Sequence, residues 1–198
     1  MSIDIKEVKR LRGLTGVGMT DAKKALEASK GDFDKALKEM RQKGLTKADK
    51  RSEREVRAGV IGTYNHDNRI GVLVEINCET DFVARNELFA QLVKDIAMHV
   101  AALDPEYLSK ADVSSDVQQN LRREFSAKAK NEGKPADIID KIVDGQIEKY
   151  LAEKCLLEQP FVKNPDQTVG EYVKEYVAKL GENIVIRRYA RFALGEVG

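Results

Sequence analysis

Cysteine is scarce in this chain, and the few cysteines form no recognisable site. Cys78 and Cys155 are the only cysteines among 198 residues, and no CxxC or Cys/His spacing surrounds them. A disulfide scaffold needs several cysteines close together, and a zinc site needs Cys or His ligands in short-range pairs. The sequence argues against both and fits the reducing environment of the cytosol.

An excess of one charge and a long apolar run are also missing. Lys and Arg number 34 against 33 Asp and Glu, so the net charge of +1 creates no field that would recruit nucleic acid or an anionic membrane. The start, Met1–Ile5, lacks the basic and apolar regions of a signal peptide, and no run approaches the ~18 apolar residues of a membrane span. We expect a cytoplasmic protein that recognises its partner through a local surface.

Motifs of catalysis are absent as well. The chain contains no phosphate loop of the GxxxxGK[ST] or GxGxxG type, no GxSxG elbow and no HExxH. Its 2 histidines, His66 and His99, have no positioned acid beside them. We interpret His99, within an apolar helical run, as a packed or hydrogen-bonded core residue. The sequence favours a binding or regulatory protein over an enzyme and predicts no metal and no cofactor.

The first 45 residues carry three short helical patterns separated by glycines. Gly31 is expected to end the second helix, and Asp32 to cap the third. This pattern resembles ubiquitin-associated (UBA) three-helix modules, in which the loop after the first helix is a partner surface. Met19 is explained equally well as a core residue, and Lys23 as part of a solvated face.

Residues 46–57 are dense in charges of both signs, which predicts a partly helical linker. The core then spans 58–198 and begins with two β-prone runs, 60–64 and 70–78. The Asn and Asp residues between these runs tolerate left-handed backbone and therefore predict a turn. His66 lies at its tip, either as a solvated residue or as a contact point.

The rest of the core alternates between helical patterns and a final strand. A helix is expected after residue 87, a helical hairpin over about 115–154, an extended loop over 158–166 and a capped helix from Thr168. In the last strand, a period of two places Arg187 and Arg191 on one face. The opposite face receives Ile184, Ile186, Ala190, Phe192 and Leu194. The fold class is therefore α+β, with the three-helix module followed by about three antiparallel strands packed with helices.

Phe82 stands out because it lies where the hydrophobic period changes from two to about 3.6. A buried strand would continue with apolar residues, but here Thr80 and Asp81 precede a large ring. A corner between a strand and a helix lies at the surface. The sequence therefore predicts that this corner presents a functional aromatic side chain.

The residues of this corner resemble a known signature. Thr80–Asn86, preceded by Asn-Cys-Glu, is similar to the signature of the bacterial elongation factor Ts family, and Thr15–Leu26 is similar to that of its N-terminal module. Gln159–Val162 and Gly181–Arg188 also resemble that family, so the likeness covers nearly the whole chain. Ala22 stands where the family often has cysteine, a change that should not touch function.

The resemblance implies that the chain exchanges guanine nucleotide on elongation factor Tu during translation. In the family, the residues that match Asp81 and Phe82 engage the GTPase domain, and the ring wedges near the magnesium and phosphate end of the nucleotide site. The partner-binding residues implied are Thr80, Asp81, Phe82 and Val83. Secondary contacts are implied for His66, Met19 and Lys23. The resemblance brings in no cofactor, nucleic acid or membrane.

The chain has one hairpin, helix and strand unit and no internal repeat, so it resembles the compact members of that family. Those members pair their sheets as homodimers, which implies a 2:2 complex with the partner. Two alternatives stay open. One is a UBA-type adaptor that binds proteins or RNA without exchange activity. The other is an enzyme that uses His99, Cys78 or Cys155, which would require a cleft and a lowered cysteine pKa.

Overall fold

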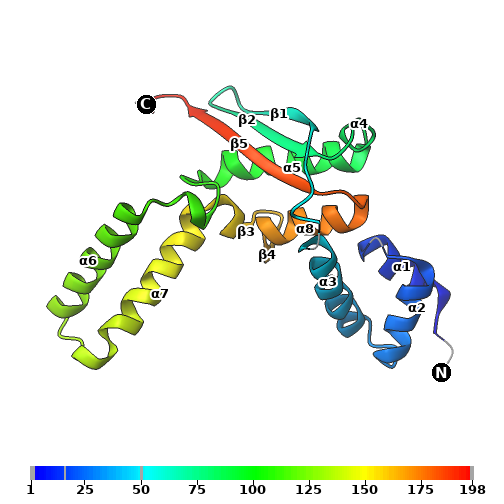
Figure 1. Ribbon diagram of the computed structural model, residues 1–198, viewed down its shortest axis with the longest axis horizontal. Coiled ribbons are helices and arrows are strands. Elements are labelled where there is room, and N and C mark those ends of the chain that lie inside the picture. The colour runs from blue at the N-terminus through cyan, green and yellow to red at the C-terminus, as the bar shows by residue number, and fades with distance from the viewer. Residues whose placement is uncertain (1–2, 16, 50, 197–198) are drawn as a thin grey trace. The chain divides into compact units, whose positions relative to one another are not determined.

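A computed structural model of the chain describes residues 3–15, 17–49 and 51–196. It has the expected α+β fold, with helices first and antiparallel strands packed with helices afterwards (Figure 1). Two compact units are present: residues 1–98 with 171–198, and residues 99–170. Within the described residues, no helix is long and apolar enough to cross a membrane. The module and linker boundaries at 45 and 57 stay predictions.

Three helices begin the first unit: α1 (Ile5–Thr15), α2 (Met19–Ala28) and α3 (Phe33–Asp49). Gly31 follows α2 with a φ of 87°, and Asp32 Oδ1 accepts a hydrogen bond of 3.0 Å from the Lys35 amide, as the sequence predicted. Helix α3 is longer than expected. A single glycine, here Gly44, costs about 1 kcal/mol relative to alanine, which weakens a helix without ending it. The three helices share a core that consists of Val8, Leu11, Ala22, Ala25, Leu26, Ala36 and Met40.

The sheet of the first unit contains β1 (Ala58–His66), β2 (Ile70–Cys78) and β5 (Ile184–Ala193), antiparallel in the order β1-β2-β5. Asp67 and Asn68 form the hairpin turn with φ values of 51° and 57°, the left-handed backbone that these residue types tolerate. The hairpin register places Ala58 beside Cys78, so β1 begins where β2 ends. The turn at Asp67 and Asn68 is therefore at the far end of the hairpin from Cys78.

Strand β5 corrects one prediction. The register with β2 shifts between Glu75 and Ile76, which pair with Arg188 and Ile186, so Arg187 is an extra residue. Such a bulge reverses the face on which every later side chain lies. Beyond it, Phe192 is 71% exposed, whereas the Arg191 side chain is only 13% exposed. The expected apolar face, continuous from Ile184 to Leu194, is therefore wrong.

Helices α5 (Glu87–Leu103) and α8 (Val169–Leu180) supply the buried layer of the first unit, and α8 begins directly after Thr168, as expected. Gly62 in β1 permits close approach of α5, because a Cβ there would collide with Val93 Cγ1. Tyr172 of α8 donates a hydrogen bond of 2.7 Å to Asp95 of α5. These contacts hold both helices in place beneath the strands that carry the corner at Phe82.

The second unit contains the expected helical hairpin, α6 (Ser115–Asn131) and α7 (Ala136–Lys154), whose helices lie side by side in Figure 1. The hairpin core is formed by Ala129, Ile139 and Val143, with Phe125, Ile142 and Ile147 around them. Short 3-10 turns, η1 (Lys110–Asp112) and η2 (Leu156–Glu158), flank it. The extended loop predicted at 158–166 contains a small hairpin of β3 (Pro160–Phe161) and β4 (Asn164–Thr168). Proline is tolerated in such an edge strand.

Candidate functional site

The candidate site is the corner between β2 and α5. Strand β2 ends at Cys78, and one helical turn, α4 (Asp81–Ala84), follows before α5 begins. Thr80 precedes α4 in extended backbone, with a φ of −132°, and its Oγ1 accepts a bond of 3.5 Å from the Val83 amide. The Ala84 amide donates to the Thr80 carbonyl at 3.1 Å. The sequence therefore makes a capped single turn rather than a free loop.

Phe82 and Val83 point in different directions from this turn. Val83 is buried with 9% of its surface exposed, whereas Phe82 is 91% exposed. Adjacent helical residues point about 100° apart, so anchoring Val83 in the core directs Phe82 to solvent. A single exposed apolar residue is ordinary on a protein surface. Here, however, a nearly complete aromatic ring is held in water by a short turn whose ends are hydrogen-bonded.

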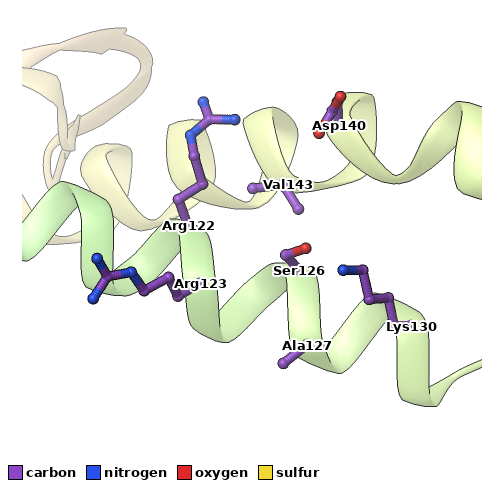
Figure 2. Close-up of a pocket in the computed structure, with 7 residues that line it drawn as sticks. All are labelled: Arg122, Arg123, Ser126, Ala127, Lys130, Asp140 and Val143. Atoms are coloured by element: carbon purple, nitrogen blue, oxygen red, sulfur yellow. The ribbon is translucent and has the colours of Figure 1, made fainter.

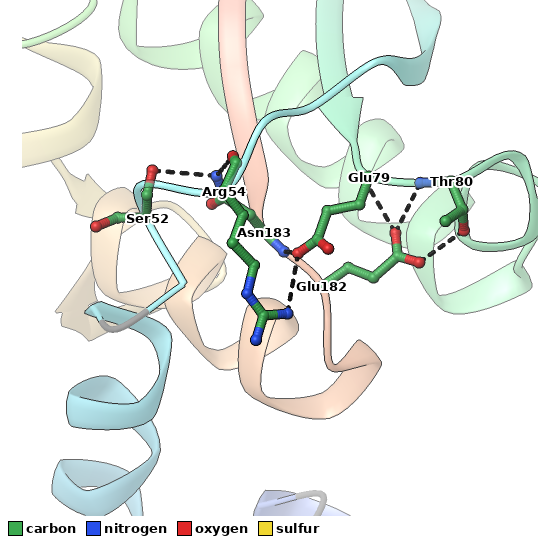
Figure 3. A network of polar contacts seen from close by, with 6 residues as sticks. All are labelled: Ser52, Arg54, Glu79, Thr80, Glu182 and Asn183. Atoms are coloured by element: carbon green, nitrogen blue, oxygen red, sulfur yellow. Dashed lines mark hydrogen bonds and ion pairs between the residues drawn. The ribbon is translucent and has the colours of Figure 1, made fainter.

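A carboxylate from a distant segment braces the corner (Figure 3). Glu182 Oε2 accepts hydrogen bonds from the Glu79 and Thr80 amides at 3.1 and 3.0 Å. Its Oε1 accepts a bond of 2.6 Å from the Thr80 hydroxyl. One side chain thus satisfies three donors in the two residues that precede α4.

Glu79 and Asn183 extend the network toward the segment that follows α3. Glu79 Oε1 accepts a hydrogen bond of 2.6 Å from the backbone N–H of Asn183 and contacts Arg54 Nη1 at 3.5 Å. The Asn183 side chain, in a residue only 4% exposed, donates to the carbonyls of Ser52 and Arg54 at 3.2 and 2.8 Å. The turn before β5 therefore binds both the corner and residues 52–54 (Figure 3).

The implied partner-binding residues occupy three separate elements. Thr80, Asp81 and Phe82 are exposed together at the corner, while Val83 is buried beneath them. His66, at the hairpin turn, has a half-exposed side chain, stacks on Tyr64 with ring centroids 6.1 Å apart, and its Nδ1 lies 3.1 Å from the Tyr64 hydroxyl.

The other two implied contacts lie on α2. Met19, its first residue, is 38% exposed. Lys23 Nζ lies 3.8 Å from Glu27 Oε1, an exposed pair one helical turn apart. Such surface pairs contribute little to stability, so Lys23 can exchange this contact for another carboxylate at low cost.

Sequence reasoning missed Glu79, Glu182 and Asn183 as members of the site. Glu182 and Asn183 belong to the Gly181–Arg188 segment, whose only sequence signal is its resemblance to the family. Its role depends on hydrogen bonds between residues more than 100 positions apart, which leave no periodic signal in the local sequence. A polar pair next to a glycine at the start of a strand was the one available hint.

The cysteines do not have the environment of a nucleophile. Both Cys78 and Cys155 are buried. Burial, and then the negative charge of Glu182, raises the pKa of Cys78 to about 11, and burial also raises the pKa of Cys155. A reactive cysteine needs a lowered pKa and access to substrate. The alternative of a cysteine enzyme therefore loses its main requirement. Among the described residues, no cluster of His, Cys, Asp and Glu could hold a metal ion.

The helical hairpin carries a shallow groove of about 440 Å³ between α6 and α7 (Figure 2). It is lined by Arg122, Arg123, Ser126, Ala127, Lys130, Asp140 and Val143. Arg122 is paired with Asp144 across the hairpin. Sites for single-stranded nucleic acid combine cations with aromatic rings on which bases stack, and none of the residues named here is aromatic. The groove gives no support to the RNA-binding alternative.

His99 is a core residue, as predicted. It is fully buried, its Nδ1 accepts a bond of 3.2 Å from the Val162 amide, and its Nε2 lies 2.9 Å from Gln159 Oε1. Because Nδ1 accepts, the ring proton is on Nε2 and is donated to Gln159. Burial lowers the pKa of His99 below its ordinary value of 6.5.

We therefore expect the imidazole of His99 to remain neutral when the pH is lowered through 6.5, its ordinary value. The unfolded chain takes up this proton first, so the free energy of unfolding falls as the pH drops below that value toward the pKa of the folded state. NMR titration of the imidazole resonances checks the expectation, with His66→Ala to assign the two rings. A His99 resonance that titrates at 6.5 or above would contradict the burial argument.

Comparisons with known proteins agree with the corner motif. A family model described as Elongation factor TS matches residues 18–196. A curated protein named Elongation factor Ts from Thermodesulfovibrio yellowstonii is 48% identical to this chain, over 99% of this chain and 98% of the relative. The relative of the same name from Geotalea uraniireducens is 51% identical, over 99% of this chain and 91% of the relative. The one from Carboxydothermus hydrogenoformans is 53% identical, over 96% of this chain and 88% of the relative. The family model covers the unit of residues 99–170 in full and the other unit from residue 18 to residue 196. The chain belongs to the elongation factor Ts family.

Proposed function

We propose that this chain promotes GDP release from elongation factor Tu by inserting the corner at Asp81 and Phe82 near the magnesium and phosphate end of the partner's nucleotide site. Membership of the elongation factor Ts family supports the broader role, a nucleotide exchange factor for elongation factor Tu in translation. The observation that carries the finer proposal is Phe82, which is 91% exposed on a turn anchored by Val83 and hydrogen-bonded at both ends.

The proposed mechanism is a coupling between two binding events. An aromatic ring that enters a pocket of the partner and loses its water contributes strongly to binding, as central aromatic residues do at protein interfaces. If the pocket exists only when the magnesium and phosphate contacts are loosened, then binding of the ring lowers the partner's affinity for GDP. By reciprocity, GDP weakens binding of this chain by the same factor. Asp81 adds a negative charge beside the ring, where phosphate would otherwise be held.

Release of a fluorescent GDP analogue from elongation factor Tu tests the proposal. Addition of the intact chain, in the presence of excess unlabelled GDP, should accelerate the release, and the acceleration should saturate as the chain concentration rises. Bovine serum albumin at the same concentration serves as the inert protein control. An unchanged release rate at saturating chain concentration would overturn the proposed function.

Secondary contacts complete the proposed complex. The exposed ring of His66 lies at the opposite end of the hairpin from the corner, so one strand pair presents two contact points to a large partner. Met19 and Lys23, at the start of α2, supply an apolar and a basic contact for the GTPase domain.

We further propose that the chain forms a two-fold homodimer through the outer face of its sheet, giving a 2:2 complex. Ile61, Leu73 and Phe192 on this face are 64%, 48% and 71% exposed. The register places Leu73 opposite Ala190, and Gly71 opposite Phe192, so these residues share one face. Ile61, Leu73 and Ala190 line a shallow hollow of about 220 Å³ on this face. The ion pair of Glu75 and Arg188 borders it. A two-fold axis allows such an apolar patch to cover its own copy.

Light scattering at micromolar concentration should therefore report twice the 22.2 kDa of one chain. Phe192→Glu should shift the mass toward the single-chain value, because a carboxylate within an apolar interface loses its hydration without gaining a partner. Phe82→Ala is the matched control, because it removes another exposed ring and should leave the dimer intact. A wild-type mass of 22.2 kDa would exclude the dimer.

A further inference from the structure

We propose that Glu182 is a positioning residue for nucleotide exchange, which holds the Asp81 and Phe82 turn in the orientation that enters the partner. The inference rests on the proposed function and adds a residue outside the family signature at the corner. Glu182 lies in the turn between α8 and β5, and its carboxylate contacts the partner-binding corner through Glu79 and Thr80.

The α4 turn is too short to hold one orientation firmly by itself. Helix α4 is 4 residues long, and the first turn of a helix fixes several dihedral angles for a single hydrogen bond, so it is unfavourable alone. Its internal cap is weak, since the Val83 amide lies 3.5 Å from Thr80 Oγ1. A further contact, beside the burial of Val83 and the backbone hydrogen bonds of the turn, is needed to hold Phe82 in one orientation.

Glu182 provides that contact. Its carboxylate accepts three bonds of 2.6 to 3.1 Å from the backbone and hydroxyl groups immediately before α4. Bonds to an ionised acceptor are shorter and stronger than neutral ones. The Thr80 hydroxyl donates to Glu182 at 2.6 Å and so keeps its lone pairs directed toward the Val83 amide. Glu182 therefore orients the residue that caps the turn on which Phe82 sits.

Asn183, next to Glu182, fixes the turn between α8 and β5 in place. Asn183 donates two side-chain bonds to the carbonyls of residues 52 and 54, and its amide donates to Glu79. The turn that carries Glu182 is thus held by Glu79 at the corner and by the backbone of residues 52 and 54. A rigid base matters because a carboxylate on a mobile loop would follow the corner rather than hold it.

A double-mutant cycle with Phe82 tests this role. Glu182→Ala should lower the apparent kcat/KM of GDP exchange about tenfold, since displacement of a contact group by about 1 Å can cost more than that. In a Phe82→Ala background, the same substitution should cost less than about twofold, because the two residues act through one contact. Glu182→Gln retains an acceptor and a donor for Thr80 and should restore at least about half of the wild-type rate. Glu148→Gln, an exposed change on α7, is the matched control.

The outcomes separate the two proposals. If wild-type chain accelerates release and Phe82→Ala does not, while Glu182→Ala retains the full rate, then the positioning role is wrong and the proposed function stands. Equal losses from Glu182→Ala in both backgrounds would likewise show a general structural effect and overturn the inference. Circular dichroism and thermal midpoints of each variant identify losses that come from unfolding. Failure of the wild-type chain to accelerate release would instead remove the proposed function itself.

Discussion

Phe82→Ala is expected to lower the apparent kcat/KM of GDP exchange on elongation factor Tu by about 30-fold. The ring is 91% exposed in the free chain, so its removal takes almost no packing from the fold. Central aromatic residues at interfaces typically contribute about 2 kcal/mol or more, and that free energy corresponds to the stated factor. The far-UV circular dichroism spectrum and the thermal midpoint should match those of the wild type. The measurement is stopped-flow release of a fluorescent GDP analogue.

Two comparisons make this result specific. Ile138→Ala removes a partly exposed apolar side chain from α7, away from the corner, and should exchange at the wild-type rate. Phe82→Leu keeps an apolar group but loses the flat ring and should fall between wild type and Phe82→Ala. If Phe82→Ala unfolds the chain while its folded fraction exchanges normally, then Phe82 serves the core and another residue drives exchange.

The corner could be predicted from sequence because its signal is local. The change of period at Asn77–Asn86 depends on neighbouring residues, and so do the cap at Asp32 and the turn at Asp67 and Asn68. Each of these features is fixed by backbone conformations that particular residue types favour over a few positions. For the same reason the exposed ring of Phe82 followed from the polar residues beside it.

Features that depend on pairing between distant strands could not be predicted in this way. The bulge at Arg187 appears only when β5 is aligned with β2, and it moves Phe192 from the expected buried face to the exposed face. That single shift also creates the apolar surface on which the dimer proposal rests. The brace from Glu182 to Thr80 similarly joins residues that are 102 positions apart. The local hydrophobic periodicity of the sequence indicates neither the bulge nor this hydrogen bond.

Gly59→Ala, near the start of β1 and beside the corner, is expected to lower the free energy of unfolding by about 3 kcal/mol. Gly59 has a φ of 148°, where L side chains carry a strain of about 1–3 kcal/mol. Its Cβ would also collide with the Ile76 carbonyl and lie 2.7 Å from Asn77 Cα, and overpacking of this kind adds a similar cost. Both neighbours are backbone atoms, so neither can rotate away.

Gly145→Ala is the control, because Gly145 lies in α7, outside the sheet, and a Cβ there meets nothing within 4 Å. Its free energy of unfolding should equal the wild-type value or exceed it by up to about 1 kcal/mol, because alanine favours a helix more than glycine does. Urea denaturation at one protein concentration compares the free energies of unfolding of the wild type and the two variants.

Gly59 pairs with Asn77, whose side chain donates to the Ala58 carbonyl at 3.3 Å, so the strain would fall directly beneath Glu79 and Thr80. Exchange by Gly59→Ala should therefore fall even where the chain remains folded. Equal stability of the two alanine variants would show that the start of β1 relaxes freely and that the corner does not depend on it.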